Sequence, residues 1–281
     1  MRVLASEALT STVCSLLKEA CVVLPEDVSE ALKTALASAD DGSRSEQVLE
    51  LICENASLAK NDKLPVCQDT GTTVVFIEWG AQVSLDKGTL QEAVDNGVRK
   101  AVEEAYLRRS IVKDPLDRVN TNDNTPASLT VIPIDGEKVK VTVLPKGAGC
   151  ENMTKLIMLR PADGKDGVKK AVIEAVKNSG GNACPPLVVG VGLGGDGSKA
   201  PTLAKKALTR KIGERNKNEF YADFEEELKA ELNATGQGPL GFGGSPTVLD
   251  LFIETSPCHI ASLPVAICLN CHAARCASAE L

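Results

Sequence analysis

Helix-type and strand-type apolar patterns follow one another along this chain, and their order constrains its fold more than any other feature. In the first 60 residues apolar side chains recur at three- and four-residue spacing, which predicts helices over 6–23, 25–37 and 43–60. A buried strand is then expected over 72–79, where the sequence is TTVVFIEW. We therefore expect a helical opening layer, residues 1–60, packed with a mixed sheet.

The rest of the chain continues this mixture of elements. Helices are expected over 89–108, 167–179, 202–212 and 218–234, and strands over 129–133, 138–144, 187–191, 248–254 and 260–269. The Asp135-Gly136 turn predicts that the strands on either side of it form a hairpin. No internal repeat and no linker interrupts the series. The sequence thus predicts the α+β class and a single irregular domain over 1–281.

Charge and hydropathy argue against two classes of partner. The chain has 31 Lys and Arg against 38 Asp and Glu, so its net charge is −7, and nucleic acids attract basic proteins instead. Gly, Pro or His interrupts the apolar runs near residues 187 and 260 before they reach the roughly 18 residues of a membrane span. The N-terminus does not resemble a signal peptide. We expect a cytoplasmic protein that binds neither nucleic acid nor membrane.

Ten cysteines are scattered over the chain, at positions 14, 21, 53, 67, 150, 184, 258, 268, 271 and 276. Disulfide frameworks are typical of small secreted scaffolds, so this distribution favours reduced thiols. Such thiols either pack in the core or bind metal or iron–sulfur. Cys14, Cys21 and Cys53 fall at core-facing positions of predicted helices, and we assign these three to packing.

A glycine-rich segment suggests one alternative function. Gly190-x-Gly192-x-x-Gly195 follows a predicted strand and precedes a predicted helix, as in dinucleotide-binding folds. Those folds place an acidic residue about 20 positions further on, where this chain has RKIG at 210–213. An NAD-dependent oxidoreductase is therefore a weakly supported alternative.

The C-terminal segment suggests a second alternative. Residues 258–276 hold four cysteines and both histidines of the chain, a composition that suits a structural zinc site. However, Cys268 and Cys271 form the only C-x-x-C pair, whereas zinc modules normally use two pairs. A zinc-stabilised binding module is the second alternative, and Cys258 and Cys268 compete with Cys271 as ligands.

Three polar clusters lie along the chain, and two of them are next to a cysteine. QDTG follows Cys67, NTNDNT fills 120–125, and Glu151-Asn152 follows Cys150. Each is rich in groups that bind carboxylate or hydroxyl oxygens, although the same residue types also form turns. Any one cluster is explained by turn chemistry, but the three together favour a shared site.

Five ordered motifs resemble the alpha subunit of class I fumarase and L-tartrate dehydratase, a family of iron–sulfur hydro-lyases. They are PVCQDTG at 65–71, VNTNDNTP at 119–126, PKGAGCENM at 145–153, ACPP at 183–186 with GVG at 190–192, and HIASLP at 259–264 with NCHA at 270–273. The motifs occur in the family's order and span most of the chain, from about residue 51 to the end.

The resemblance implies that Cys67, Cys184 and Cys271 ligate a 4Fe-4S cluster and leave one iron without a protein ligand. Four thiolates would close the cluster for electron transfer. Three leave an iron that acts as a Lewis acid on a substrate hydroxyl and carboxylate, by the same logic as the open position of catalytic zinc.

The same resemblance implies that Asp69 and His259 are catalytic. It also implies five substrate contacts: Gln68, Asp69, Arg108, Gly149 and His259. Arginine suits a carboxylate through its bidentate fork. Two alternatives stay open: Asp69 as a loop organiser only, and Arg109 in place of Arg108 as the carboxylate clamp.

The implied activity is the reversible hydration of fumarate to L-malate, with L-tartrate dehydratase and methylfumarate hydratase as alternatives. Cys150 is more typical of tartrate dehydratases, whereas the following Glu151-Asn152-Met153 resembles two-subunit fumarases, and we place fumarate first. In the resembled family the proton-transferring residue lies in the second half of the enzyme, which is either a C-terminal domain or a separate beta subunit. A beta subunit is thus expected as a partner, in a two-fold assembly of alpha–beta pairs that acts on a small dicarboxylate.

Overall fold

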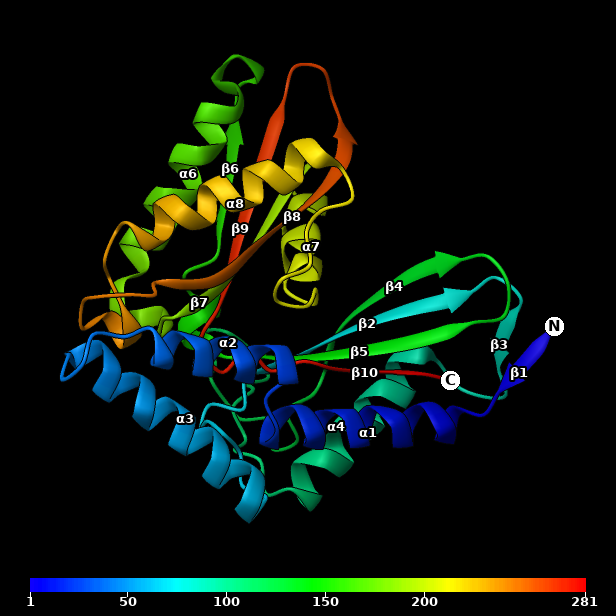
Figure 1. Ribbon diagram of the computed structural model, residues 1–281. Coiled ribbons are helices and arrows are strands. Elements are labelled where there is room, and N and C mark those ends of the chain that lie inside the picture. The colour runs from blue at the N-terminus through cyan, green and yellow to red at the C-terminus, as the bar shows by residue number, and fades with distance from the viewer. The chain divides into compact units, whose positions relative to one another are not determined.

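Helices and mixed sheets alternate in the computed structural model, which describes residues 1–281 and confirms the predicted α+β class. The contacts within the chain divide it into two compact units. Unit 1 consists of Met1–Pro25, Asn55–Ala148 and Arg275–Leu281, and unit 2 consists of Glu26–Glu54 and Gly149–Ala274. Each unit has its own four-stranded sheet (Figure 1). A single domain over 1–281 stays a prediction.

The sheet of unit 1 has the strand order β10-β5-β2-β4, with β2 (Thr72–Gly80), β4 (Ser128–Ile134), β5 (Val139–Lys146) and β10 (Ala277–Glu280). β2 pairs antiparallel with β5 and parallel with β4, so the sheet is mixed. The predicted hairpin is therefore wrong, because β2 lies between its two strands. β2 is almost continuously buried and suits the centre of the sheet, whereas β4 is largely accessible and suits the edge.

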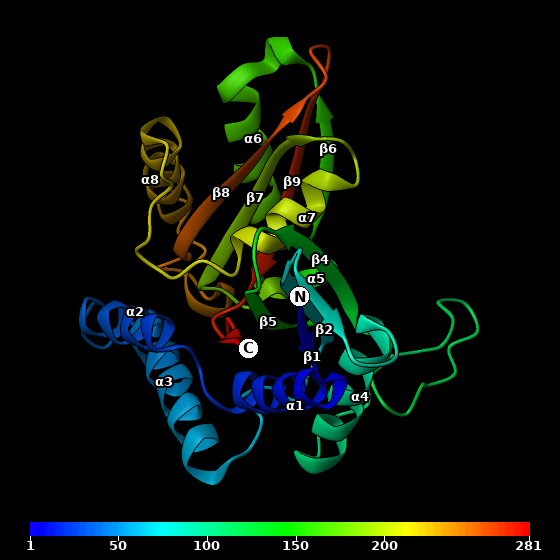
Figure 2. The same cartoon turned by 90° about the vertical axis from the view of Figure 1, so that its right-hand side faces the viewer.

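Two helices cover one face of this sheet, α1 (Ser6–Val22) and α4 (Leu90–Glu104) (Figure 2). α1 packs against α4, β5 and β10. α4 begins with a capping box, in which Thr89 Oγ1 accepts from the Glu92 N–H and the Glu92 carboxylate accepts from the Thr89 N–H. A short parallel pair, β1 (Arg2–Leu4) and β3 (Val83–Leu85), completes the unit.

The predicted opening helices are all present and are divided between the two units. α1 belongs to unit 1, α2 (Glu26–Ala37) to unit 2, and the boundary between the units falls within α3 (Arg44–Asp62). By length and composition alone the stretch Ser6–Ala37 could cross a membrane. Half of its apolar 18-residue window is buried inside the fold. Since the apolar face of α1 packs on the unit 1 sheet, core packing accounts for this composition.

The sheet of unit 2 has the order β6-β9-β7-β8, with β6 (Lys155–Leu159), β7 (Leu187–Gly195), β8 (Val248–Cys258) and β9 (Leu263–Asn270). β7 pairs parallel with β8 and antiparallel with β9. α6 (Gly164–Ser179) and α8 (Glu219–Asn233) pack on one face, and α7 (Lys199–Ala207) packs on the other (Figure 1).

The glycine-rich segment forms part of β7 and is not a phosphate-binding loop. A Cβ atom on Gly190 would lie 2.2 Å from the Ala204 carbonyl oxygen, and one on Gly192 would lie 2.0 Å from that of Ala200. Both acceptors belong to α7, so these glycines let the helix approach the strand closely. This packing explains the motif without a dinucleotide.

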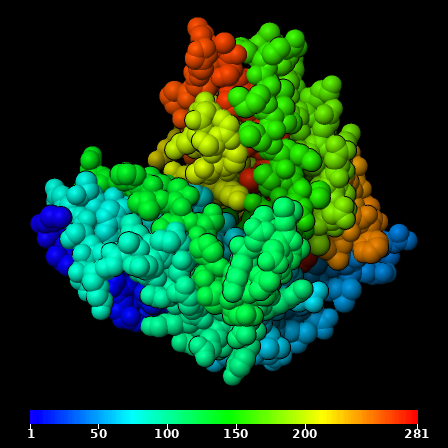
Figure 3. All heavy atoms as spheres, turned by 180° about the vertical axis from the view of Figure 1, so that it is seen from behind, coloured from blue at the N-terminus to red at the C-terminus, as the bar shows by residue number.

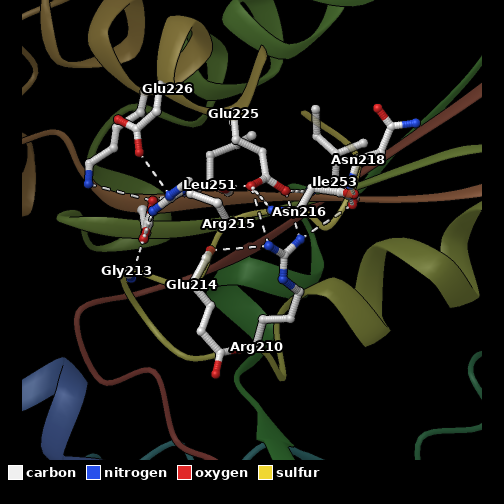
Figure 4. A network of polar contacts seen from close by, with 12 residues as sticks. Arg210, Gly213, Glu214, Arg215, Asn216, Asn218, Glu225, Glu226, Leu251 and Ile253 are labelled. Atoms are coloured by element: carbon white, nitrogen blue, oxygen red, sulfur yellow. Dashed lines mark hydrogen bonds and ion pairs between the residues drawn. The ribbon is translucent and has the colours of Figure 1, made fainter. Parts of the chain in front are cut away.

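A buried ion-pair network joins the segment after α7 to α8 and β8 (Figure 4). The Glu225 carboxylate is fully buried; its Oε1 accepts from Arg210 Nη1 at 2.7 Å and from the Ile253 N–H at 2.8 Å. The Asp250 carboxylate, equally buried, accepts from the Gly213 N–H at 2.7 Å and pairs with Arg215. The network therefore holds the 208–218 segment against the sheet.

Glu225→Ala should destabilise the protein by about 3–5 kcal/mol, because it removes the buried carboxylate that pairs with Arg210 and Arg215 and accepts from the Ile253 N–H. Glu226, the matched control, is 58% exposed and pairs with Arg215 at 2.8 Å. Glu226→Ala should cost less than about 1 kcal/mol. Urea unfolding of the two variants measures the difference, and equal losses would contradict this account of the network.

Candidate functional site

The predicted ligand Cys67 lies in unit 1, on the loop between α3 and β2, with a half-buried side chain. Its neighbour Val66 fixes the loop through two hydrogen bonds. The Val66 N–H donates to the Cys21 carbonyl oxygen at 2.8 Å, and Asn55 Nδ2 donates to the Val66 carbonyl oxygen at 2.9 Å. The ends of α1 and α3 thus hold the cysteine in place.

Asp69 organises the same loop through both carboxylate oxygens. Oδ1 accepts from the Gly71 N–H at 2.9 Å, and Oδ2 accepts from the Ala148 N–H at 2.7 Å. These contacts match the loop-organiser alternative, and they also fix the direction of the carboxylate. The catalytic role of Asp69 stays a prediction, as does substrate contact by the exposed neighbour Gln68.

A long loop connects α4 to β4 (Figure 2), and Arg108 lies near its start. The Arg108 carbonyl oxygen accepts from Thr70 Oγ1 at 2.7 Å and from Asn124 Nδ2 at 2.8 Å. The Arg109 carbonyl oxygen accepts a bond from Asn120 Nδ2 at 3.0 Å. Both arginines are exposed. The Thr70 bond links the Arg108 backbone to the Cys67 loop, and the choice of Arg108 over Arg109 as the carboxylate clamp stays a prediction.

Asp123 is the charged centre of this loop. Burial raises the pKa of its carboxyl, but hydrogen bonds from the Thr125 N–H at 3.0 Å, the Thr125 hydroxyl at 2.9 Å and Arg99 at 2.9 Å outweigh burial. Together they lower the Asp123 pKa from 3.8 to about 2. The ionised Asp123 carboxylate therefore stabilises the loop.

Because the pKa of Asp123 is lowered in the fold, its stabilisation of the loop should be fully present above about pH 4 and lost as the pH falls through about 2. NMR titration of the Asp123 side-chain carboxyl carbon should give a midpoint near the lower value. Asp123→Asn should weaken hydrogen-exchange protection of the Thr125 amide at neutral pH. Asp117→Asn in the same loop should not, and an ordinary Asp123 midpoint would contradict the assignment.

Unit 2 brings together the segments that carry Cys184 and Cys271. Cys184 precedes β7 and Cys271 follows β9, and the antiparallel register pairs Val188 with Asn270. The His272 N–H donates to the Cys184 carbonyl oxygen at 3.2 Å, and His272 Nδ1 lies 3.1 Å from the same atom. These contacts hold the Cys271 segment beside the Cys184 segment.

The conformation and surroundings of Cys184 are unusual for a cysteine. Its φ is +52°, in the left-handed region that non-glycine residues rarely adopt, and its side chain is exposed. Gly149 packs beneath the same segment, since a Cβ atom there would lie 2.8 Å from the Asn182 carbonyl oxygen. The absence of a side chain at Gly149 therefore serves backbone packing, and contact with substrate stays a prediction.

His259 lies on the exposed connection between β8 and β9, whose orange-red spheres stand out from unit 2 in Figure 3. Its Nδ1 accepts from the Ala261 N–H at 3.1 Å, and its carbonyl oxygen accepts from the Ser262 hydroxyl at 3.2 Å. Ile260 beside it is 92% exposed. The ring is thus oriented by the turn in which it lies, and its catalytic role stays a prediction.

The implied cluster ligands belong to both units: Cys67 to unit 1, and Cys184 and Cys271 to unit 2. All three thiols lie on loops and are exposed or partly exposed, whereas Cys150 and Cys268 are buried. Three accessible thiols are a soft donor set that suits iron–sulfur, so the residues fit the group. Within neither unit do three or more His, Cys, Asp or Glu residues form a group that could hold a metal ion.

The positions of two candidate zinc ligands, Cys258 and Cys268, argue against the zinc alternative. Cys268 is buried in β9, where Thr154 Oγ1 donates to its sulfur at 3.7 Å, and Cys258 lies exposed at the end of β8. Of the cysteines assigned to packing, Cys14 and Cys21 are buried as predicted, but Cys53 is only partly buried.

Sequence reasoning overlooked two residues near the predicted ligands. His272 was noted only as part of a motif, yet it bonds to Cys184. Arg275 is buried, and its Nη1 donates to the Asp69 carbonyl oxygen at 2.8 Å. The sequence signal for Arg275 is a single charged residue among small ones, in AARCASA at 273–279.

Comparisons with known proteins give one consistent family. A model of the family described as Fumarate hydratase (Fumerase) matches residues 10–280. A protein of Methanocaldococcus jannaschii with the provisional name L(+)-tartrate dehydratase subunit alpha is 42% identical over 273 residues, 95% of each chain. Proteins named L(+)-tartrate dehydratase subunit alpha from Escherichia coli K12 and Shigella sonnei are each 34% identical over 257 residues, 90% of this chain and 84% of theirs.

Proposed function

The chain belongs to the Fumarate hydratase (Fumerase) family of hydro-lyases, and from this premise we propose that it is the alpha subunit of an L(+)-tartrate dehydratase. The observation that carries the proposal is its similarity, over nearly the whole length, to relatives with that name. The sequence analysis placed fumarate first. The relatives favour the alternative, and fumarate hydratase becomes the second candidate because its family model covers the chain.

Cys150 gives the substrate proposal a structural basis. Its thiol is buried and donates to the Ala183 carbonyl oxygen at 3.3 Å, one residue before Cys184. The cysteine that is more typical of tartrate dehydratases thus packs against a proposed ligand segment. L-Tartrate has a hydroxyl on each central carbon and malate on only one, so a small change in this packing would suffice to discriminate between them.

In the proposed reaction, a C–O bond of tartrate breaks and the neighbouring carbon loses a proton, which gives water and the enol of oxaloacetate. A 4Fe-4S cluster held by Cys67, Cys184 and Cys271 would supply the Lewis acid for the leaving hydroxyl. Arg108 would pair with a substrate carboxylate through its guanidinium.

Two further groups have proposed roles in the same reaction. The carboxylate of Asp69, held by two backbone N–H groups, would act from a fixed position. His259 would donate a proton or hydrogen bond through Nε2, since its Nδ1 accepts from the Ala261 N–H.

The relatives are named as alpha subunits, which supports a beta subunit as the partner of this chain. We propose that the beta subunit contributes the proton-transferring residue and that alpha–beta pairs assemble with two-fold symmetry in the cytoplasm. The chain alone should then bind iron and show little turnover. Full turnover by the purified chain without a partner would contradict the divided site.

Single substitutions of the proposed ligands, Cys67→Ser, Cys184→Ser and Cys271→Ser, should each abolish the cluster. After anaerobic purification the unaltered chain should hold about four irons and absorb in the visible range. Cys258→Ser is the matched control, because Cys258 is exposed and its bond to the Ser262 carbonyl oxygen suits a hydroxyl equally well. Loss of iron in this control, or its retention in all three ligand variants, would contradict the ligand assignment.

The substrate is identified by assaying the reconstituted alpha–beta pair with L-tartrate, L-malate, fumarate and methylfumarate. We expect L-tartrate to have the highest kcat/KM, by at least about tenfold, which corresponds to about 1.4 kcal/mol of transition-state discrimination. Cys150→Ser should narrow this ratio while iron content stays unchanged. Faster turnover of fumarate or malate would establish the second candidate instead.

A further inference from the structure

Unit 1 contains a buried cation without an acidic partner. The Arg275 side chain is 2% exposed, and its guanidinium forms no ion pair with any carboxylate. Its Nε is buried and has no hydrogen-bond acceptor. Burying a charge is unfavourable unless an opposite charge and hydrogen bonds compensate it. The guanidinium therefore has no carboxylate within ion-pair distance, and its Nε can donate to a further acceptor.

The position of the guanidinium indicates where that anion lies. Arg275 Nη1 donates to the Asp69 carbonyl oxygen at 2.8 Å, two residues after Cys67. A Cβ atom on Gly147 would lie 3.5 Å from Arg275 Nη2 and 3.3 Å from Asp69 Oδ2. The guanidinium thus lies against the loop that carries Cys67, with donors to spare.

Cys21 supports the same location. The Val66 N–H donates to its carbonyl oxygen, which fixes Cys21 beside the Cys67 loop. Burial raises the pKa of the Cys21 thiol to about 11, and two charges act on it: Arg275 lowers this pKa and Cys67 raises it. Arg275, Cys21 and Cys67 therefore share one neighbourhood within unit 1.

We propose that Arg275 is a positioning residue whose charge compensates the Cys67 thiolate and the cluster bound to it, while its Nη1 bond holds the Cys67–Asp69 loop. This inference rests on the proposed iron–sulfur function. A 4Fe-4S core with three thiolate ligands is an anionic group, and nearby charge and hydrogen bonds to sulfur set its reduction potential. A cation stabilises the reduced, more negative state, so Arg275 raises the potential and makes oxidation by air less favourable.

The test compares Arg275→Gln, which removes the charge but keeps a donor, with Arg275→Lys, which keeps the charge. In anaerobically purified full-length chain, Arg275→Gln should lower the one-electron reduction potential by about 59 mV, equivalent to a tenfold change in the equilibrium constant. It should also lose iron several-fold faster in air. Arg275→Lys should stay close to the unaltered chain, as should Arg118→Gln, which changes an exposed arginine of unit 1.

Several outcomes would overturn the inference. An unchanged potential in Arg275→Gln would show that the charge has no role, and equal changes in the Gln and Lys variants would assign the effect to shape. If Arg275→Gln raises only the KM of the reconstituted alpha–beta pair for the dicarboxylate and leaves the potential unchanged, Arg275 is a substrate contact instead. If the unaltered chain binds no iron, the proposed function fails and the inference with it, whereas iron binding with an unchanged variant defeats the inference alone.

A structure of the unaltered chain, crystallised anaerobically with iron and sulfide, gives an independent measurement if Arg275→Gln does not fold. We expect Nε or Nη2 of Arg275 to donate to Cys67 Sγ or to a cluster sulfide, at about 3.5 Å or less. If neither Nε nor Nη2 of Arg275 donates to a sulfur atom in the loaded protein, the inference is overturned.

Discussion

The two backbone hydrogen bonds accepted by the Asp69 carboxylate are the constraint on which the proposed site in unit 1 depends. They join the start of β2 to the end of β5, because Gly71 immediately precedes β2 and Ala148 lies just beyond β5. The strands already meet there through the pairing of Thr72 with Lys146. Cys67, Asp69 and the buried Arg275 are thus gathered at one end of an antiparallel pair.

Unit 2 uses the same arrangement with different residues. Cys184 precedes β7 and Cys271 follows β9, and since these strands are antiparallel, both segments lie at the same end of the sheet. The two His272 contacts with the Cys184 carbonyl oxygen then hold the segments together. In each unit, polar groups and thiols far apart in the sequence become neighbours because one strand begins where its antiparallel neighbour ends.

Elsewhere the fold uses glycine and buried charge for packing. Gly190 and Gly192 let α7 lie directly on β7, and the Glu225 network fastens the segment after α7. The proposed ligands lie on loops, which contribute little apolar packing of their own. Rigid helices and strands beside the loops are therefore needed to hold the ligands in position. Family membership shows a hydro-lyase, and the three accessible thiols and the buried arginine support the cluster that we propose for it.

The sequence by itself determined most helices, the central strands and the family, because periodicity and motif order are local properties of the chain. It did not determine which strands pair. β2 separates the expected hairpin, and β10, with the sequence ASAE, becomes a strand only because the edge of β5 offers hydrogen bonds. The role of Gly190 and the isolation of Arg275 likewise arise from residues distant in the chain, and non-local burial and pairing leave no local pattern to read.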